Sequence, residues 1–226
     1  MSIGRPAAGS PDRKEQQRAR IVAAAERCAV EKGLHAATIA NIAATAKMSP
    51  GLIYRYFANK NEIILAIIER QLAEQLAHMT SLKSGRDLHR QIVELFANWQ
   101  RGDPSVMSAA LFLEISAEAT RDPEIAKAVV DADRIGDRTF QRWLREKMDQ
   151  TGPAFDESIR SQAMILHCFI EGLAARAVRE PDLSVDEVSR TFRRLLKMLL
   201  PPEDCSTQVT VDEPPTDCRS GPQDQT

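Results

Sequence analysis

Residues 38–60 read TIANIAATAKMSPGLIYRYFANK, and this stretch decides the fold. Thr38 precedes the apolar segment 39–46, and its hydroxyl is suited to cap the free N–H groups at the start of a short helix. Ser49 and Pro50 form a second start signal, because serine is a preferred N-cap and proline a preferred first helical residue. Two short helices joined by a tight turn predict a helix-turn-helix.

The segments on either side supply the rest of this motif. Between Arg13 and Lys32 apolar residues recur at spacings of three and four, which predicts an amphipathic helix that Gly33 ends. The second short helix is expected to end near Phe57, and Asn59 then caps a longer helix through about Leu82. A helix-turn-helix packs on a third helix so that its second helix can enter the major groove of DNA. We therefore interpret residues 13–62 as a DNA-binding domain.

The rest of the chain also carries helical periodicity, without a strand-like run. Glycines and prolines mark the boundaries between its segments. Further helices are predicted over Asp87–Arg101, Ser105–Arg121, Pro123–Gln150, Glu157–Glu180 and Ser184–Leu200. The predicted fold class is all-α with about nine helices, in which a three-helix domain precedes a larger helical domain.

The composition is that of an ordinary globular protein. Of 226 residues, 43% are hydrophobic and 27% are charged, and no run approaches the roughly 20 apolar residues that a membrane span needs. Residues 1–17 are polar and lack the apolar core of a signal peptide, so we expect a cytoplasmic location. Cys28 and Cys168 are expected to be small core residues on helices.

Charge is distributed unevenly along the chain. Residues 1–62 hold ten lysines and arginines against five acidic residues, whereas residues 63–200 hold nineteen against 21. A basic end on a near-neutral body is typical of a protein that places one end on a polyanion. Residues 1–12 are expected to form a flexible arm. Residues 201–226, with one basic and six acidic residues, are expected to form a disordered acidic tail.

Signals for enzymatic or metal chemistry are absent from the sequence. It contains no GxSxG, no phosphate-binding glycine loop and no HExxH, and its four histidines are scattered singly. The cysteines form no CxxC pair and have no histidines at metal-ligand spacing. We therefore predict that the protein is not an enzyme, with no catalytic residue, cofactor or metal site.

Roughly residues 15–65 resemble the TetR family of transcription regulators. The matching elements are Ile21–Ala25, Lys32-Gly33, Thr38-Ile39, Ile42-Ala43, Ser49–Phe57 and Asn59–Glu62. The order Ile53-Tyr54-x-Tyr56-Phe57-x-x-Lys60 is the most specific of these, because it mixes core and exposed residues. Lys47 departs from the family, which usually has glycine in the turn; either the lysine adopts a left-handed backbone or the turn differs locally.

The resemblance implies a set of DNA-binding residues. Thr38 offers its hydroxyl and backbone amide to a phosphate, the two tyrosines donate their hydroxyls, and Lys60 adds a charge-assisted contact. Arg55 has the side chain suited to reading guanine. The implied set is Thr38, Ala40, Ser49, Pro50, Gly51, Leu52, Tyr54, Arg55, Tyr56 and Lys60. The basic residues Arg5, Arg13, Lys14, Arg18 and Arg20 either reach DNA or form a solvated tail, and both alternatives stay open.

The same resemblance makes residues 63–200 an effector-binding and dimerisation domain. The stretch 111–115 with Asp122-Pro123 is loosely similar to the branch of the choline-responsive repressor. Residues suited by type and placement to an effector pocket are Phe96, Trp99, Met107, Phe112, Glu114, Phe140, Trp143, Met164 and His167, although any single residue of these types is more often part of a core than of a ligand site. Glu114 either attracts a cationic effector, pairs with an arginine such as Arg138, or faces solvent. The last two helices are expected to form the homodimer interface through Phe169, Gly172, Leu173, Arg176, Phe192, Leu195, Leu196 and Leu199.

The sequence thus predicts a homodimeric transcription regulator, interpreted as a repressor. It would bind an inverted-repeat operator in double-stranded DNA and respond to a small-molecule effector, without a membrane partner. The alternative is a helical adaptor whose basic end binds a protein or a membrane surface rather than specific DNA.

Overall fold

The computed structural model describes residues 11–103, 105–148 and 152–200, and within these ranges it contains nine helices and no strand. This confirms the all-α prediction. The helices are α1 (Pro11–Lys32), α2 (Ile39–Ala46), α3 (Pro50–Tyr54), α4 (Lys60–Thr80), α5 (Gly85–Arg101), α6 (Ala109–Ala119), α7 (Pro123–Lys147), α8 (Pro153–Arg179) and α9 (Val185–Leu199). Residues 1–10 of the predicted arm and the whole of the predicted tail, 201–226, lie outside the described residues.

Local capping sets the start of each helix around the turn. The side chains of Thr38, Ser49 and Asn59 each accept a hydrogen bond from a backbone N–H three residues later, as N-caps do. Gly33 follows α1 with φ 82°, and Lys47 ends α2 with φ 54°. Lys47 therefore occupies the left-handed region that its place in the turn requires, at a steric cost that glycine would not have.

Several predicted boundaries were wrong by a few residues. α3 ends at Tyr54 rather than near Phe57, although the backbone N–H groups of Tyr56 and Phe57 still bond to the carbonyl of Ile53. α6 begins at Ala109 rather than Ser105, because Ser108 caps it by accepting from the N–H of Leu111. α8 begins four residues earlier than predicted, at Pro153, since proline suits the first turn of a helix.

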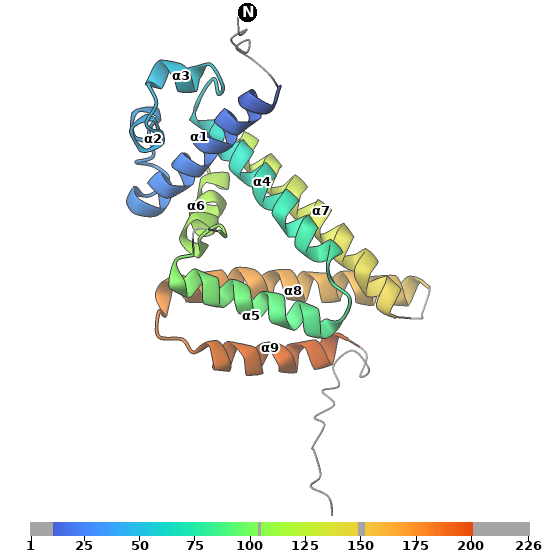
Figure 1. Cartoon of the computed structure of the whole chain (residues 1–226). Coiled ribbons are helices and arrows are strands. Elements are labelled where there is room, and N and C mark those ends of the chain that lie inside the picture. The colour runs from blue at the N-terminus through green and yellow to red at the C-terminus, as the bar shows by residue number, and fades with distance from the viewer. Residues whose placement is uncertain (1–10, 104, 149–151, 201–226) are drawn as a thin grey trace, which may run out of the picture.

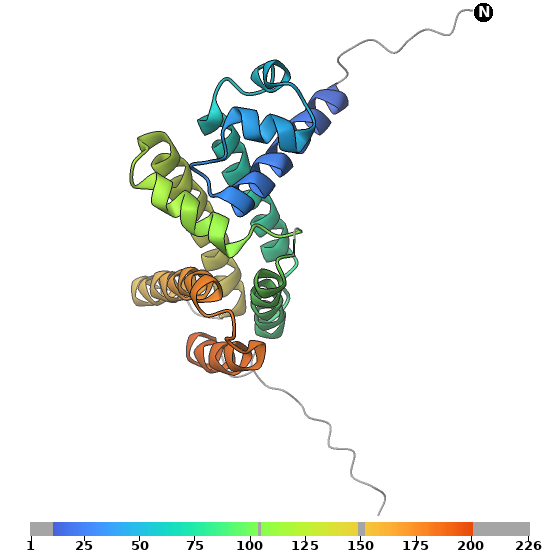
Figure 2. The same cartoon turned by 90° about the vertical axis from the view of Figure 1, so that its left-hand side faces the viewer.

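Two hydrophobic cores hold the helices together. The first consists mainly of side chains from α1 to α4, with contributions such as Leu111 of α6 and Ile125 of α7. The second joins α5, α7, α8 and α9 around Phe96 and Phe192, both fully buried. Figure 1 shows α1–α3 at one end of the molecule, α5, α8 and α9 at the other, and α4 and α7 descending between them. The view from the side in Figure 2 shows the same division between the two ends.

The helix α4 therefore crosses the domain boundary that the sequence placed between residues 62 and 63. Its first turns pack in the first core through Ile63, Ile64 and Ile67, and its last turn carries Met79 to the second. A rigid helix that belongs to both cores can carry a displacement from one to the other.

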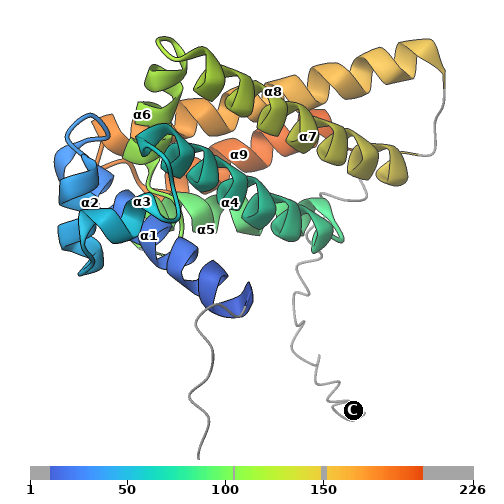
Figure 3. The same ribbon diagram turned by 90° about the horizontal axis from the view of Figure 1, so that it is seen from above.

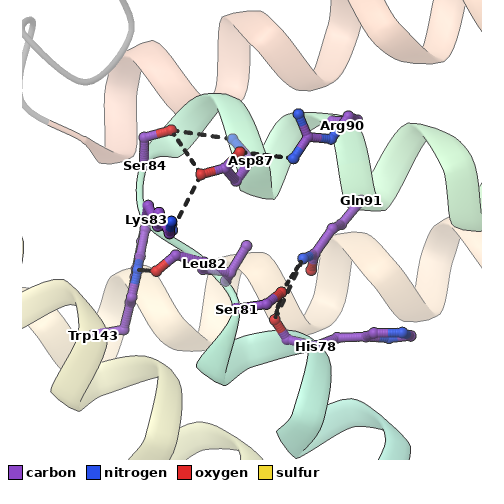
Figure 4. Close-up of polar contacts among 9 residues, drawn as sticks. All are labelled: His78, Ser81, Leu82, Lys83, Ser84, Asp87, Arg90, Gln91 and Trp143. Atoms are coloured by element: carbon purple, nitrogen blue, oxygen red, sulfur yellow. Dashed lines mark hydrogen bonds and ion pairs between the residues drawn. The ribbon is translucent and has the colours of Figure 1, made fainter.

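The junction of α4 and α5 is fixed by side-chain hydrogen bonds (Figure 4). Ser84 caps α5, and the carboxylate of Asp87 accepts from the backbone N–H of Lys83 at 3.1 Å and from the Ser84 hydroxyl at 3.1 Å. Burial favours the neutral acid, but these hydrogen bonds and the charge of Arg90 together lower the pKa of Asp87. The indole N–H of Trp143 donates to the carbonyl of Leu82 at 3.2 Å, which ties α7 to the same turn.

No described helix is long and apolar enough to cross a bilayer. Nor do the described residues contain a group of three or more His, Cys, Asp or Glu side chains arranged to hold a metal ion.

Candidate DNA interface and effector pocket

The reading head, by which we mean residues 38–60, presents short helices on a buried base. Ile53 and Phe57 are buried in the first core, and Met48 packs against it. Tyr54 leaves 56% of its surface exposed beside an exposed Arg55. Because α3 is anchored through Ile53 alone among its five residues, the rest of its surface is open to a partner. In the view from above (Figure 3), α2 lies at the outer edge of the molecule, and Figure 1 shows α2 and α3 at the end opposite α8.

Most of the predicted DNA contacts lie on this open surface. The exposed members of the set are Thr38, Ala40, Ser49, Pro50, Gly51, Tyr54 and Arg55, and the half-buried members are Leu52, Tyr56 and Lys60. Tyr56 also packs against the first core, so its ring has a structural role whether or not its hydroxyl reaches a phosphate. Their contacts with DNA remain predictions.

Two of the predicted phosphate contacts already have partners inside the protein. The ammonium of Lys60 donates to the carbonyl of Leu34 at 2.7 Å and lies 3.4 Å from that of His35. The backbone N–H of Thr38 donates to the carbonyl of Ala36 at 2.8 Å. The Thr38 hydroxyl accepts from Asn41 and keeps its own proton to donate. A phosphate contact from Lys60 would therefore have to share or displace its bonds to the α1–α2 turn.

Two arginines of α1 bind the reading head, and of these Arg18 is half-buried whereas Arg20 is exposed. Arg18 donates to the backbone carbonyl of Tyr56 at 2.8 Å, and its guanidinium carbon lies 4.2 Å from the centre of the Phe57 ring. Arg20 donates to the carbonyl of Ala46, the last residue of α2, at 2.7 Å. Of the basic residues that the sequence left open, Arg5 lies outside the described residues.

A pocket opens between α4, α6 and α7, close to the middle of the molecule. Its apolar walls are Ile68, Leu72, Met107, Phe112, Ile115, Val129 and Ala132. Its polar groups are Gln71, Gln75, Ser116 and Asp133. The cavity has about 70 Å³, several times the roughly 10–15 Å³ that one water molecule needs on the same scale. Apolar walls with a few convergent polar groups are typical of a small-molecule site.

Only Met107 and Phe112 of the nine predicted effector residues line this pocket. Phe96, Phe140 and Trp143 are buried in the second core, with Trp99 packed against it, and Met164 is exposed on α8. These aromatic side chains fill the space between helices, which is the alternative that the sequence left open for each of them. The signal that could have revealed the pocket is the pair Gln71 and Gln75, whose amides interrupt the apolar face of α4.

Glu114 has a different role from any that the sequence suggested. Its carboxylate accepts a hydrogen bond from the backbone N–H of Leu34, in the turn between α1 and α2. The backbone carbonyl of Leu34 accepts a hydrogen bond from the ammonium of Lys60 in α4. Both α4 and α6 line the pocket, so two pocket helices are hydrogen-bonded to the backbone of Leu34, beside the reading head. The carboxylate of Glu114 thus binds the turn between α1 and α2, and Glu114 is not among the residues that line the pocket.

His167 lies in a cluster of carboxylates between α7 and α8. Its Nδ1 lies 3.1 Å from Asp137, and its Nε2 lies 3.7 Å from Asp133 and 3.6 Å from Glu171. Burial favours the neutral imidazole, but the hydrogen bond to Asp137 and the charges of the three carboxylates raise the pKa of His167. Burial raises the pKa of Asp133, despite the nearby imidazole. The cluster links the polar end of the pocket to α8.

The predicted dimer residues fall into two groups. Leu173, Phe192, Leu196 and Leu199 are buried within the chain, and Phe192 stacks on Phe169 with ring centres 5.0 Å apart. These four cannot meet a second copy in this conformation. Gly172 and Arg176 are exposed, while Phe169 and Leu195 are half-buried. The amphipathic stripe that the sequence assigned to an interface was the stripe that closes the second core.

The open apolar surface of α8 and α9 carries other residues. Met164 leaves 68% of its surface exposed and Met198 75%, and Ile165 is exposed as well. Cys168, which was expected in the core, is exposed on α8, whereas Cys28 is buried as predicted. Positions 164, 168 and 172 recur every four residues and therefore share one face of α8.

Sequence comparison places two segments of the chain in known families. Residues 21–67 match the bacterial regulatory proteins of the tetR family, and residues 85–201 match the C-terminal domain of BetI-type transcriptional repressors. The second match alone covers more than half of the chain. The chain belongs to the TetR family of transcription regulators. This confirms the resemblance and its branch, and membership of a family of regulators supports the prediction that the chain is not an enzyme.

Individual relatives agree with this assignment. The HTH-type transcriptional regulator UidR of Escherichia coli K12 is 31% identical over 109 residues, covering 48% of this chain and 55% of the relative. The match thus spans about half the length of that relative. Salmonella enterica GusR has a solved structure with a TM-score of 0.62 and 25% identity, covering 85% of this chain and 98% of that one. A transcriptional regulator from Saccharomonospora viridis in complex with choline has a TM-score of 0.62 at 22% identity, over 80% of this chain and 96% of that one.

Proposed function

We propose that this TetR-family protein is a homodimeric transcription repressor that binds an inverted-repeat operator and responds to a small cationic molecule. The observation that carries the proposal is the reading head, with Tyr54 and Arg55 exposed on a helix whose base is buried. An exposed tyrosine beside an exposed arginine offers a neutral donor for phosphate and a forked donor for guanine. A dimer would place two such helices in successive major grooves, about 34 Å apart.

The dimer surface that we propose is the apolar face of α8 and α9. It consists of Met164, Ile165, Cys168 and Gly172 on α8 with Met198 on α9. An ideal Cβ added at Gly172 would meet nothing within 4 Å inside the subunit, so the glycine leaves room for an approaching helix. Exposed methionines are well suited to such a surface, because their flexible side chains adapt to an apolar partner.

The pocket is proposed as the effector site, and its charge indicates the class of effector. Asp133 is the one charged residue among the described residues that line it, and the other polar residues there, Gln71, Gln75 and Ser116, are neutral. The neighbouring Asp137 and Glu171 add further negative charge, which His167 offsets in part when it is protonated. A molecule with an apolar body and one positive charge would satisfy both features, since an opposite charge stabilises an ionised carboxylate in a partly buried site. The Saccharomonospora viridis protein binds choline, a molecule of this class.

The route of the response would run through the helices that form the pocket. An effector shifts DNA affinity only as far as it binds the two conformations differently. Lys60, the first residue of α4, and Glu114, in the middle of α6, both bind the backbone of Leu34. A ligand that separates these helices would move the turn that precedes α2, and with it the reading head.

Selection of random duplex DNA on the purified protein tests the operator. We expect an inverted repeat to emerge, with Tyr54→Phe weakening binding to every site and Arg55→Ala relaxing preference at one base pair. If no motif emerges and both variants behave as the wild type, the reading head is a scaffold. The protein would then be an adaptor for another protein or a membrane surface.

Thermal unfolding with matched ligand pairs tests the effector class. Each alkylammonium ion, choline included, is compared with its neutral isostere, in which a quaternary carbon replaces the nitrogen. We expect the cation to raise the midpoint more than its isostere, and Asp133→Asn to remove this difference. Equal shifts for both members of every pair would contradict a cationic effector and leave the operator result untouched.

The oligomeric state is tested by sedimentation of full-length protein. Met164→Glu with Met198→Glu is expected to shift the dimer toward monomer, because it places charges on an apolar interface. Lys127→Glu, an exposed change on α7, is the matched control. A dimer unaffected by the paired change would place the interface elsewhere.

A further inference from the structure

The two arginines of α1 that touch the reading head reach its two helices at corresponding points. Arg20 binds the carbonyl of Ala46, at the C-terminal end of α2. Arg18 binds the carbonyl of Tyr56, two residues after the end of α3. Both distances, 2.7 and 2.8 Å, are those of charge-assisted hydrogen bonds. The helix α1 thus binds the reading head at two points, the end of α2 and the segment that follows α3.

The acceptors are groups that the helices cannot satisfy themselves. The last four carbonyls of a helix have no partner within it, and the C-terminus carries partial negative charge. The N–H groups of Lys47 and Met48 bond to Ala43 and Ala44, which leaves the Ala46 carbonyl to Arg20. A guanidinium at this point satisfies the acceptor and interacts favourably with the helix dipole.

Arg18 makes a second contact that Arg20 lacks. Its guanidinium carbon lies 4.2 Å from the centre of the Phe57 ring, and Phe57 is fully buried. A planar guanidinium stacks on an aromatic face while donating along its edge, which a lysine ammonium cannot do. Arg18 thereby holds Tyr56 by its backbone and the next residue by its ring. The segment carrying Tyr54 and Tyr56 is fixed to α1 at this point.

We propose that Arg18 and Arg20 are positioning residues, which set the orientation of the recognition helix against α1 and do not bind phosphate. Each guanidinium donates to a backbone carbonyl of the reading head, so the basic character of the N-terminal end overstates the number of arginines that are free to bind DNA. This inference rests on the proposed DNA binding. It adds that specific recognition depends on two side chains that never touch the operator.

Salt-dependent binding distinguishes positioning from phosphate contact. Each lost phosphate contact reduces the slope of log K against log salt concentration by about 0.9. Substitution of a positioning residue leaves this slope unchanged, because the same phosphates are still neutralised. Such a substitution lowers the affinity for the selected operator, while the affinity for scrambled DNA stays the same. Substitution of a residue that only stabilises the fold reduces the fraction of active protein. It changes neither the slope nor the ratio of operator affinity to scrambled-DNA affinity.

The experiment measures operator and scrambled-duplex affinity of full-length protein over a range of salt. We expect Arg18→Gln and Arg20→Gln each to weaken operator binding about tenfold, with an unchanged slope and unchanged binding to scrambled DNA. Arg20→Lys is expected to restore most of the affinity, because a lysine can still donate to one carbonyl. Arg18→Lys is expected to restore less, since it cannot stack on Phe57.

Arg27→Gln is the matched control, because Arg27 is an exposed arginine on the same helix. A loss of slope in either Arg18 or Arg20 variant would overturn the inference in favour of a phosphate contact. So would an unchanged ratio of operator to scrambled affinity, or an equal loss in Arg27→Gln. A wild-type protein that selects no operator would refute the proposed function itself, which keeps the two failures apart.

Discussion

The reading head and the pocket differ in how their residues are brought together. The reading head comes from 23 consecutive residues, and each turn is set by a cap within three residues of the group it satisfies. The pocket takes its walls from three helices, residues 68–75, 107–116 and 129–133. Local signals therefore determine the first, while the second exists only where separate helices meet. Site residues that depend on local signals can therefore be predicted from the sequence more completely than site residues that depend on the packing of separate helices.

The largest expected effect is a loss of stability, and it should differ between a core residue and a pocket residue. Phe96 and Phe112 were both predicted in the pocket, but Phe96 is fully buried in the second core whereas Phe112 lines the cavity. Phe96→Ala is expected to lower the free energy of unfolding by about 3–5 kcal/mol, because it leaves a cavity between packed helices. Urea denaturation measures this loss. Phe112→Ala, which only enlarges an existing pocket, should cost clearly less; equal losses would contradict the distinction.

A smaller effect is expected at the link between the two regions. Glu114→Ala removes the acceptor of the Leu34 N–H, which should cost about 1–2 kcal/mol and speed hydrogen exchange at that amide. Glu114→Gln keeps a carbonyl oxygen at the same place and should retain most of the protection. Exchange at the Leu34 amide that stays as slow in Glu114→Ala as in the wild type would show that α6 does not hold this turn.

The cluster at the end of the pocket predicts a dependence of stability on pH. The raised pKa of His167 means that the folded state binds its proton more tightly than the unfolded state does. The resulting stability is complete below the unfolded pKa of about 6.5 and is lost as pH rises through the folded pKa. Asp133, whose pKa is also raised, acts in the same direction from a lower pH.

This loss is measured as the free energy of unfolding across neutral pH, and it should not exceed about 1 kcal/mol, because the pairs are partly exposed. His167→Gln should remove it. The prediction is wrong if wild type and His167→Gln change in parallel.

The smallest effect is expected in the turn of the reading head. Lys47 has φ 54°, where a side chain is disfavoured. Lys47→Gly relieves this strain but raises the entropy of the unfolded chain, so we expect a net gain of about 0.5 kcal/mol. Lys47→Ala is the control, because it removes the charge and keeps the strain. A gain of equal size in Lys47→Ala would mean that charge, not backbone conformation, sets the cost.

The sequence by itself determined the helical class, the order of the helices and the reading head down to its caps. Thr38, Ser49 and Asn59 cap the helices as predicted, because each acts on a backbone group within its own turn. The family followed from the same stretch, since its pattern mixes buried and exposed residues in a fixed local order.

Only the tertiary structure decided which apolar stripe closes a core and which stays open. Phe192 and Met198 lie on the same helix, yet one is fully buried and the other 75% exposed. It also decided the partners of charged groups, as when Glu114 met a backbone N–H 80 positions away and Arg18 met the carbonyl of Tyr56. Periodicity shows that a face is apolar but not what covers it, and long side chains find their partners only after the helices have packed.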